Sequence, residues 1–183
     1  MNPLGKLFYI IGASGAGKDT LMTYARTQLN GSKKVVFAHR YITRDPFAGN
    51  ENHVHLTTEE FKARREAGFF ALHWESHDNC YGIGIEINNW LQLGYNVVVN
   101  GSREYLPIAR ELYPEIITVL IAASEEVLIN RLNNRGRENA AQITERIKRT
   151  QQIQTDLSDC IKILNDYTVE VAGDELVRVI SEG

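Results

Sequence analysis

The sequence has only two cysteines and four prolines, and it contains no long apolar run. Cys80 and Cys160 are too few and too far apart for a disulfide framework or a CxxC metal site. The sequence has no stretch of about 18 apolar residues, the length that a transmembrane helix needs. The apolar run near Met1 is too short for a secretory signal. We therefore expect a cytoplasmic protein with no membrane partner.

The chain also has no excess of positive charge: its net charge is -3 and its isoelectric point is about 6.0. A nucleic-acid partner held by a broad positive field is therefore not expected. Arginine nevertheless outnumbers lysine by 13 to 7, and its planar guanidinium binds phosphate through two parallel hydrogen bonds. We expect anions to be bound locally, within one domain, since 183 residues are too few for two ordinary domains.

Short apolar runs alternate with amphipathic helical patterns, which favours an α/β fold with a five-stranded parallel sheet and helices on both faces. The expected strands span residues 7–11, 35–38, 96–100, 116–122 and 161–164. The expected helices span residues 18–30, 85–93, 103–112, 125–134, 140–157 and 173–180. Two segments interrupt this alternation: residues 40–81, with a short helix at 58–67 and a possible small sheet, and the polar residues 133–141. The core of this single domain then consists of residues 1–39, 82–132 and 142–183.

The segment GASGAGKDT, from Gly12 to Thr20, matches the phosphate-binding pattern GxxxxGK[ST] except at its last position, where Asp19 replaces a hydroxyl residue. It follows an expected buried strand and opens an expected helix, a context that an ordinary glycine turn does not explain. Its glycines let backbone N–H groups converge on phosphate, and Lys18 reaches the outer phosphates. We expect ATP to bind Gly12, Ala13, Ser14, Gly15, Ala16, Gly17, Lys18, Asp19 and Thr20.

Asp19 places a negative charge beside the expected polyphosphate, which is repulsive unless a cation lies between them. In one interpretation that cation is Mg²⁺, bound by the Asp19 carboxylate directly or through water. In the other, Asp19 only stabilises the helix N-terminus, and Thr20 or water contacts the metal. The sequence leaves both interpretations open, and both retain ATP and Mg²⁺ as cofactors.

Arginines are concentrated in RLNNRGREN, residues 131–139, where one expected helix ends and another soon begins. They could close over the transferred phosphoryl group and neutralise its charge. The alternative is a solvated loop whose arginines pair with Glu138 and Glu145. We favour the first interpretation because the same chain has a phosphate loop, and we assign catalytic roles to Lys18, Arg131, Arg135, Arg137 and Arg146.

A second phosphate clamp is predicted at Arg40, Thr43 and Arg44, just after the second expected strand. Two guanidinium groups and a hydroxyl at this place would bind a phosphorylated acceptor facing the ATP site. Surface ion pairs with Asp45 and Glu51 would explain the same spacing, and the residues alone do not decide between the two.

Asn100, Ser102 and Arg103 follow another core strand at its carboxyl end, where open α/β sheets bind ligands. Asn100 or Ser102 could order the metal or the acceptor, and Arg103 could contact phosphate, although Ser102 could also cap the next helix. Tyr81 is expected near the acceptor. The five histidines lack the spacing of a metal site, so we expect them in a polar pocket or on the surface.

The order of these motifs resembles the guanylate kinase family over nearly the whole chain: GASGAGK, ITR, FFALHWESHDNCYG, the RG of the arginine-rich segment, and LND. The resemblance implies a P-loop NTPase fold with an acceptor-binding subdomain at residues 40–81 and an Arg-rich lid at 133–141. Leu72 replaces the acidic residue that reads guanine in that family, and Ile83 replaces a hydroxyl residue. The polar groups that select guanine are therefore absent.

Within this family, the closer resemblance is to the ribose 1,5-bisphosphate phosphokinases, through GKD, HRYITRD, GNENH, YGIGIEI, VNGSR and NRGREN. It implies phosphate transfer from ATP to ribose 1,5-bisphosphate, which yields 5-phosphoribosyl 1-diphosphate (PRPP) and ADP in phosphonate catabolism. Such a small-molecule phosphorylated sugar needs cationic clamps, and its anionic oxygen needs no general base. The rivals are a guanylate-type nucleoside monophosphate kinase and a non-catalytic binding module. Nothing indicates the oligomeric state.

Overall fold

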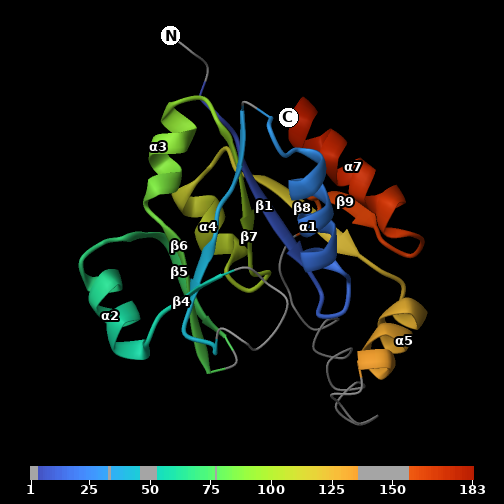
Figure 1. Cartoon of the computed structure of the whole chain (residues 1–183), viewed down its shortest axis with the longest axis horizontal. Coiled ribbons are helices and arrows are strands. Elements are labelled where there is room, and N and C mark those ends of the chain that lie inside the picture. Colours follow the sequence, from blue (N-terminus) through green and yellow to red (C-terminus); the bar gives the residue numbers. More distant parts are fainter. Residues whose placement is uncertain (1–3, 33, 46–52, 77, 136–156) are drawn as a thin grey trace.

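The computed structural model describes residues 4–32, 34–45, 53–76, 78–135 and 157–183 (Figure 1). A five-stranded sheet lies at its centre, with neighbouring strands parallel in the order β2-β7-β1-β8-β9. Its strands are β1 (Leu7–Gly12), β2 (Val35–Phe37), β7 (Asn96–Asn100), β8 (Ile117–Ala122) and β9 (Ile161–Leu164). The five predicted core strands and their parallel arrangement are confirmed.

Helices cover both faces of this sheet, as predicted (Figure 1). They are α1 (Lys18–Gln28) and α7 (Val169–Glu182) on one face and α3 (Glu86–Gln92) and α4 (Leu106–Leu112) on the other. Helix α5 (Glu125–Arg135) lies beyond the carboxyl ends of the strands (Figure 1). Successive side chains of a strand point to opposite faces, so Phe8 and Ile10 of β1 pack with α1 and α7, while Tyr9 and Ile11 pack in the core that includes α3 and α4. This burial on both faces explains why β1 is apolar throughout.

A second, smaller sheet occupies the first predicted interruption, with the strand order β4-β3-β6-β5. Its elements are β3 (Arg40–Ile42), β4 (Val54–His55), helix α2 (Thr58–Glu66), β5 (Phe70–Ser76) and β6 (Asn79–Gly84). Phe61 and Phe70 stack 4.6 Å apart in its own small core. The predicted short helix and small sheet are confirmed. The division into core, subdomain and lid stays a prediction, and β6 continues past the expected boundary at residue 81.

Two helices begin three or more residues away from the predicted start, while α3 begins only one residue late. Helix α4 begins at Leu106, three residues late, because the preceding residues form a turn closed by a hydrogen bond from the Leu106 N–H to the Arg103 carbonyl. Helix α7 begins at Val169, four residues early, because Gly173 lies inside the helix and does not mark its start. A Cβ at Gly173 would overlap the ring of Tyr24, so this glycine allows α7 to lie close against α1.

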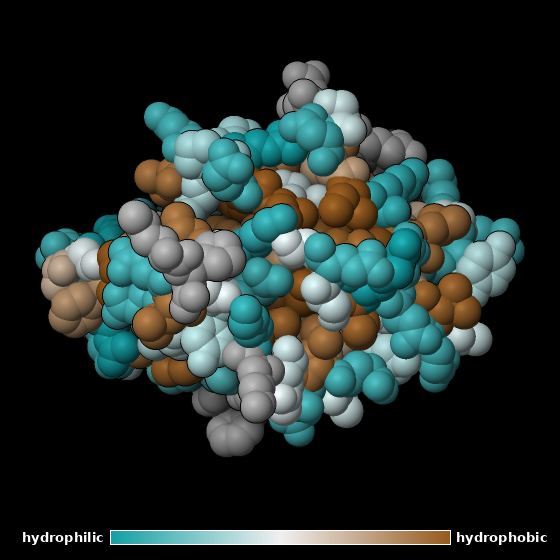
Figure 2. All heavy atoms as spheres, turned by 90° about the horizontal axis from the view of Figure 1, so that it is seen from above, coloured by the Kyte–Doolittle hydropathy of each residue, from teal (hydrophilic) through white to brown (hydrophobic). Residues whose placement is uncertain are grey.

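None of the described helices is long and apolar enough to cross a membrane. On the face seen from above in Figure 1, hydrophobic and hydrophilic residues are interspersed and form no continuous apolar surface (Figure 2). Exposed apolar side chains include Ile108 and Leu112 on α4 and Val171 on α7, and some exposed apolar surface is ordinary for a folded domain.

Four polar side chains are buried in the described part of the chain: Arg40, Asn100, Thr118 and Asn165. Asn100 is the last residue of β7, and Asn165 directly follows β9. Parallel strands end at the same edge of a sheet, and open α/β sheets bind their ligands at the carboxyl edge. A buried polar group is unfavourable unless it is hydrogen-bonded. The burial of Asn100 and Asn165 therefore indicates a binding site at this edge.

Candidate active site

The predicted phosphate loop lies between the end of β1 and the start of α1. Gly15 and Gly17 have φ angles of 91° and 87°, in the left-handed region that favours glycine. The Ala16 N–H donates to the Ala13 carbonyl at 3.1 Å and closes the turn. The predicted residues occupy the expected places: Gly12 ends β1, Ala13, Ser14, Gly15, Ala16 and Gly17 form the loop, and Lys18, Asp19 and Thr20 open α1.

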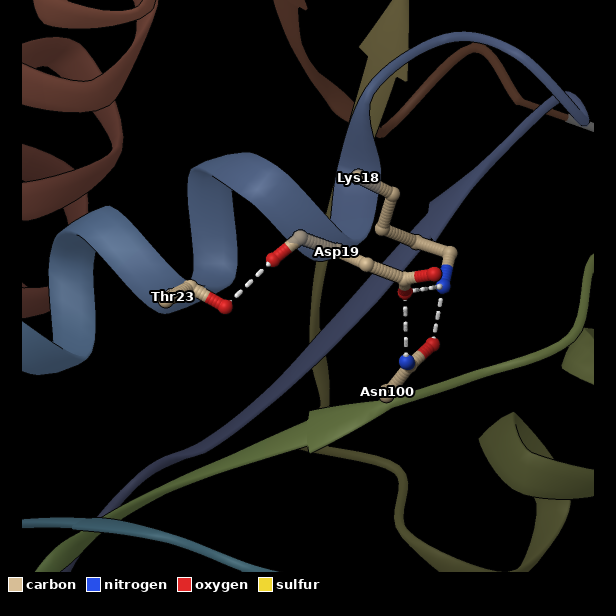
Figure 3. A network of polar contacts seen from close by, with 4 residues as sticks. All are labelled: Lys18, Asp19, Thr23 and Asn100. Carbon is tan, nitrogen blue, oxygen red and sulfur yellow. Dashed lines mark hydrogen bonds and ion pairs between the residues drawn. The ribbon is translucent and has the colours of Figure 1, made fainter. Parts of the chain in front are cut away.

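Three polar side chains meet beside this loop: Lys18 and Asp19 from α1, and Asn100 from the end of β7 (Figure 3). The Lys18 ammonium donates to Asp19 Oδ1 at 3.1 Å and to Asn100 Oδ1. The amide nitrogen of Asn100 donates to the same Asp19 oxygen at 3.0 Å. These contacts exist because β1 and β7 are hydrogen-bonded neighbours in the sheet. Asn100 thus links the phosphate loop to the loop after β7.

Asp19 is ionised in this network. Burial of the carboxyl group alone would raise its pKa, but the Lys18 ammonium, the Arg40 guanidinium and the Asn100 amide together lower the pKa below its usual value. The side chain is still 55% exposed, so a ligand can reach it. Mg²⁺ prefers hard oxygen donors and commonly combines one or two carboxylates with phosphate and water. The Asp19 carboxylate fits such a metal, although no group of three His, Cys, Asp or Glu side chains among the described residues could hold one alone.

Tyr9 of β1 supports the loop after β7. Its ring is fully buried, and its hydroxyl accepts a hydrogen bond from the Ser102 N–H at 2.9 Å and donates to the Ser102 carbonyl at 3.2 Å. Burial raises the pKa of the phenol, so the hydroxyl keeps its proton. Gly101 allows this contact, because a Cβ there would overlap the ring. The alternative role of Ser102 as a helix cap is wrong, since α4 begins only at Leu106.

Arg40 begins β3 and has only 9% of its surface exposed. Its guanidinium carbon lies 5.1 Å from the centre of the Tyr81 ring. Tyr81 stacks on Trp74 at 5.5 Å, and Trp74 stacks on Tyr105 at 5.5 Å. The Tyr81 ring therefore contacts this cation, and the Trp74 and Tyr105 rings continue the stack behind Tyr81. The charge of Arg40 is close enough to the phosphate loop to lower the pKa of Asp19. Arg40 of the small sheet therefore interacts electrostatically with the phosphate loop.

The other predicted acceptor residues have different surroundings. Thr43 Oγ1 accepts a hydrogen bond from the Cys80 N–H at 2.9 Å, which holds β3 against β6. The Arg44 carbonyl accepts one from His55 Nδ1 at 2.9 Å, and the Arg44 side chain is half-buried. Arg103 is half-buried in the turn that precedes α4. Their contacts with an acceptor stay predictions.

Leu72 and Ile83 lie opposite each other on β5 and β6, and both are fully buried. They belong to the same apolar core as Tyr9 of β1, on the side of the sheet that carries α3 and α4. Neither side chain has a polar atom. These two positions therefore offer no hydrogen-bond acceptor for the N–H groups of a purine, which agrees with the departure seen in the sequence.

Among the predicted lid arginines, Arg131 contacts the phosphate loop: its Nη1 donates to the Ala16 carbonyl at 3.3 Å. Arg135 is the last residue of α5, so the first three residues of the predicted lid are helical. Arg137 and Arg146 lie outside the described residues, as does the predicted helix at 140–157 except for its last residue. A clamp formed by these arginines stays a prediction.

Two residues of the site were not selected from the sequence. Asn165, directly after β9, is 2% exposed, and its amide nitrogen donates to the Ala16 carbonyl at 2.7 Å. Tyr9, described above, is the second. The available signals were the LND motif and a tyrosine inside an apolar strand. Neither signal says which distant loop the side chain will contact.

Comparisons with known proteins agree with this arrangement. The family model described as guanylate kinase matches residues 5–183. The ribose 1,5-bisphosphate phosphokinase PhnN of Thiobacillus denitrificans is 54% identical over 97% of this chain and 94% of that protein. The protein of the same name from Psychromonas ingrahamii is 48% identical over 96% of this chain and 90% of its own length. A crystal structure of guanylate kinase from Anaplasma phagocytophilum gives a TM-score of 0.72 over 99% of this chain and 87% of that one; at 16% identity it shows the shared fold.

Proposed function

Because the chain belongs to the guanylate kinase family, we propose that it is an ATP-dependent ribose 1,5-bisphosphate phosphokinase that works in the cytoplasm, in phosphonate catabolism. It converts the sugar bisphosphate to PRPP and releases ADP. Relatives of that name, matched over most of their length, support this activity. The observation that carries it is the acceptor side, where buried Arg40 provides positive charge while Leu72 and Ile83 provide no polar group for a base.

On the nucleotide side, the N–H groups of the phosphate loop and of the first turn of α1 bind the phosphates of ATP. Lys18 adds a positive charge at the outer phosphates. Lys18 donates to Asp19 and Asn100 in the structure, and phosphate oxygens of ATP would compete for the same ammonium group. Asp19 would hold Mg²⁺, which supplies further positive charge at the phosphates when it is bound.

On the acceptor side, the attacking atom is an oxygen of the 1-phosphate of the sugar. It is already anionic, so no general base is needed. A bond forms from this oxygen to the γ-phosphorus, and the bond between the γ-phosphorus and the oxygen that bridges to the β-phosphate breaks, with its electron pair leaving on ADP. The protein contributes position and charge. Charge neutralisation is assigned to Lys18, Arg131, Arg135, Arg137 and Arg146, and acceptor binding to Arg40, Thr43, Arg44, Tyr81, Asn100, Ser102 and Arg103.

The purified protein with MgATP is expected to release ADP when ribose 1,5-bisphosphate is supplied. It should turn over GMP poorly, because Leu72 and Ile83 carry no group that could read the base. A coupled ADP assay compares both acceptors, and mass spectrometry identifies PRPP. Arg40→Ala should raise the KM for the sugar about tenfold or more, since a charge-assisted contact with phosphate is lost. Arg64→Ala removes the guanidinium over Tyr41 in the same small sheet and serves as the matched control.

Either rival would give a distinct result. Strong turnover of GMP without activity on the sugar bisphosphate would assign a guanylate-type kinase. Absence of ATP binding in calorimetry would assign a non-catalytic binding module. An unchanged KM for the sugar in a folded Arg40→Ala protein would show that Arg40 does not bind the acceptor. It would not contradict the proposed reaction.

Asp19→Asn keeps the shape of the side chain and removes its charge. If the carboxylate helps to hold Mg²⁺, half-maximal activity should require about tenfold more Mg²⁺ or more, while Asp19→Ser should retain part of the affinity through its hydroxyl. The pKa of Asp19 is lowered, so its carboxylate stays ionised from about pH 8 to pH 6, and the ratio of the Asp19→Asn to the wild-type Mg²⁺ requirement should stay constant over this range. Magnesium titrations at fixed total ATP measure both effects.

The control for Asp19 is Glu59→Gln, which removes an acidic residue from the first turn of α2. Both substitutions weaken a favourable interaction with a helix N-terminus, but only Asp19 lies at the phosphate loop. Equal Mg²⁺ requirements for wild type, Asp19→Asn and Glu59→Gln would favour the other interpretation, in which Asp19 acts only on its helix.

A further inference from the structure

Asn165 is held in a fixed place at the carboxyl edge of the sheet. Its backbone N–H donates to the Ala122 carbonyl at 2.8 Å, which extends the pairing of β8 and β9. The next residue, Asp166, accepts a hydrogen bond from the Ser124 N–H at 2.7 Å. Asn165 is 2% exposed, so its amide is enclosed by protein and its direction is set by these neighbours.

The Asn165 side chain contacts the outside of the phosphate loop. Its Nδ2 donates to the Ala16 carbonyl at 2.7 Å, and Arg131 Nη1 donates to the same oxygen at 3.3 Å. Gly17 is closely packed against this amide, because a Cβ there would overlap Asn165 Nδ2. One donor directly after β9 and one donor from α5 therefore converge on one carbonyl oxygen of the loop.

The direction of this carbonyl decides the direction of the next N–H group. The Ala16–Gly17 peptide is trans and planar, so its C=O and N–H point in opposite directions. When Asn165 and Arg131 hold the Ala16 oxygen on one side of the loop, the Gly17 N–H is directed to the other side. Backbone N–H groups of such a loop bind phosphate oxygens on its concave side.

The oxygen of the Asn165 side-chain amide supports a role for Asn165 in positioning the phosphate loop. Asn165 Oδ1 is buried and accepts no hydrogen bond from the described residues. A buried acceptor without a partner is unfavourable for folding. An asparagine at this position therefore provides a donor to Ala16 at a cost in stability, as expected for a residue kept for its effect on the loop.

We propose that Asn165 is a positioning residue for the nucleotide: by donating to the Ala16 carbonyl, together with Arg131, it aims the Gly17 N–H at a phosphate of ATP. This inference rests on the proposed function only in taking ATP as the ligand, and it is independent of the acceptor. Asn165 touches neither reactant. Its effect reaches the phosphates through a single peptide group.

Two substitutions of similar shape test the donor. Asn165→Leu has no donor at any pH, and Asn165→Asp has one only when its carboxyl group is protonated. Calorimetry with MgATP and the intact protein should show about tenfold or more weaker binding for both at pH 8.5. The KM for the sugar bisphosphate should change less than about twofold, because the acceptor side is untouched.

The pH dependence separates positioning from packing. A carboxyl group at this 2% exposed position faces the Arg131 guanidinium, which donates to the same Ala16 oxygen, and lies next to the Asp166 carboxylate. Arg131 lowers its pKa, whereas burial and Asp166 raise it. With the raising effects dominant, the Asn165→Asp protein should recover most of its ATP affinity relative to wild type as the pH falls from about 8.5 to 6. Asn165→Leu should not recover. Normal affinity in Asn165→Leu, with a loss confined to Asn165→Asp, would reveal simple charge repulsion and overturn the proposal.

Asn96 provides the matched control. It lies at the start of β7, at the opposite edge of the sheet, and its Nδ2 donates to the Ile180 carbonyl at 3.1 Å. Asn96→Leu should lower the midpoint of thermal unfolding and leave ATP affinity unchanged. If Asn165→Leu fails to fold, Asn165→Asp across the pH range decides: a constant affinity deficit overturns the proposal. If the wild type binds ATP and the Asn165 variants change ATP affinity as expected, while no activity toward the sugar bisphosphate is found, the result would reject the proposed acceptor but not the role of Asn165.

Discussion

Replacing Lys18 with alanine is expected to lower kcat about a thousandfold or more. The transferred phosphoryl group spreads negative charge over its oxygens, and a fixed cation at this place lowers the barrier by several powers of ten. The Lys18 side chain is 15% exposed and already lies between Asp19 and Asn100. Its removal also deprives Asp19 of the cation that does most to lower its pKa. The remaining carboxylate then repels the incoming phosphates.

Steady-state kinetics with both substrates measures the effect, and thermal unfolding verifies that the Lys18→Ala protein is folded. Lys62→Ala is the control, because Lys62 is 66% exposed on α2 and pairs only weakly with Glu66 at 4.0 Å. It should leave kcat unchanged. A folded Lys18→Ala protein with turnover near that of the wild type would refute the assignment of the phosphate loop.

Gly17→Ala is expected to abolish detectable ATP binding, with kcat/KM reduced about a thousandfold. Gly17 has a φ of 87°, which disfavours any residue with a Cβ. A Cβ there would also overlap Asn165 Nδ2 and lie 3.5 Å from Arg131 Nη1. The overlap is relieved either by moving the peptide groups of the loop or by displacing the Asn165 amide from the Ala16 carbonyl. Both movements turn N–H donors of the loop away from phosphate, and each misdirected donor costs about a hundredfold.

Gly31→Ala separates this effect from backbone strain. Gly31 has nearly the same φ of 86°, but a Cβ there would meet nothing within 4 Å. Both substitutions should lower the free energy of unfolding by about 1 kcal/mol or more, as measured by denaturant titration. Only Gly17→Ala should lose ATP binding in calorimetry. Equal ATP affinities in the two variants would show that the packing around Gly17 is unimportant for the nucleotide.

The features that the sequence predicted well are local. The apolar strand β1, the glycines after it and the helical spacing after Lys18 are consecutive in the chain, so their pattern alone indicates strand, loop and helix. The start of α7 was missed for the opposite reason. Gly173 looks like a helix boundary in the sequence, and its contact with Tyr24, which explains it, is tertiary.

The site contacts that the sequence did not predict join distant segments. Asn165 reaches the Ala16 carbonyl across 149 positions, and Tyr9 reaches Ser102 across 93. These pairs depend on which strands are neighbours, and strand order follows from the packing of the whole sheet rather than from any one segment. A tyrosine in an apolar strand gives no sign of the loop that its hydroxyl will contact.

Strand β1 carries both halves of the site. Its carboxyl end continues into the segment around the nucleotide, and its Tyr9 hydroxyl fixes the backbone of the segment that begins with Asn100. Fully buried residues on both faces make β1 one of the stiffest parts of the fold. The distance between the nucleotide loop and the proposed acceptor loop is thus fixed by one rigid strand. Any movement that brings ATP and the sugar phosphate closer together has to come from other parts of the chain.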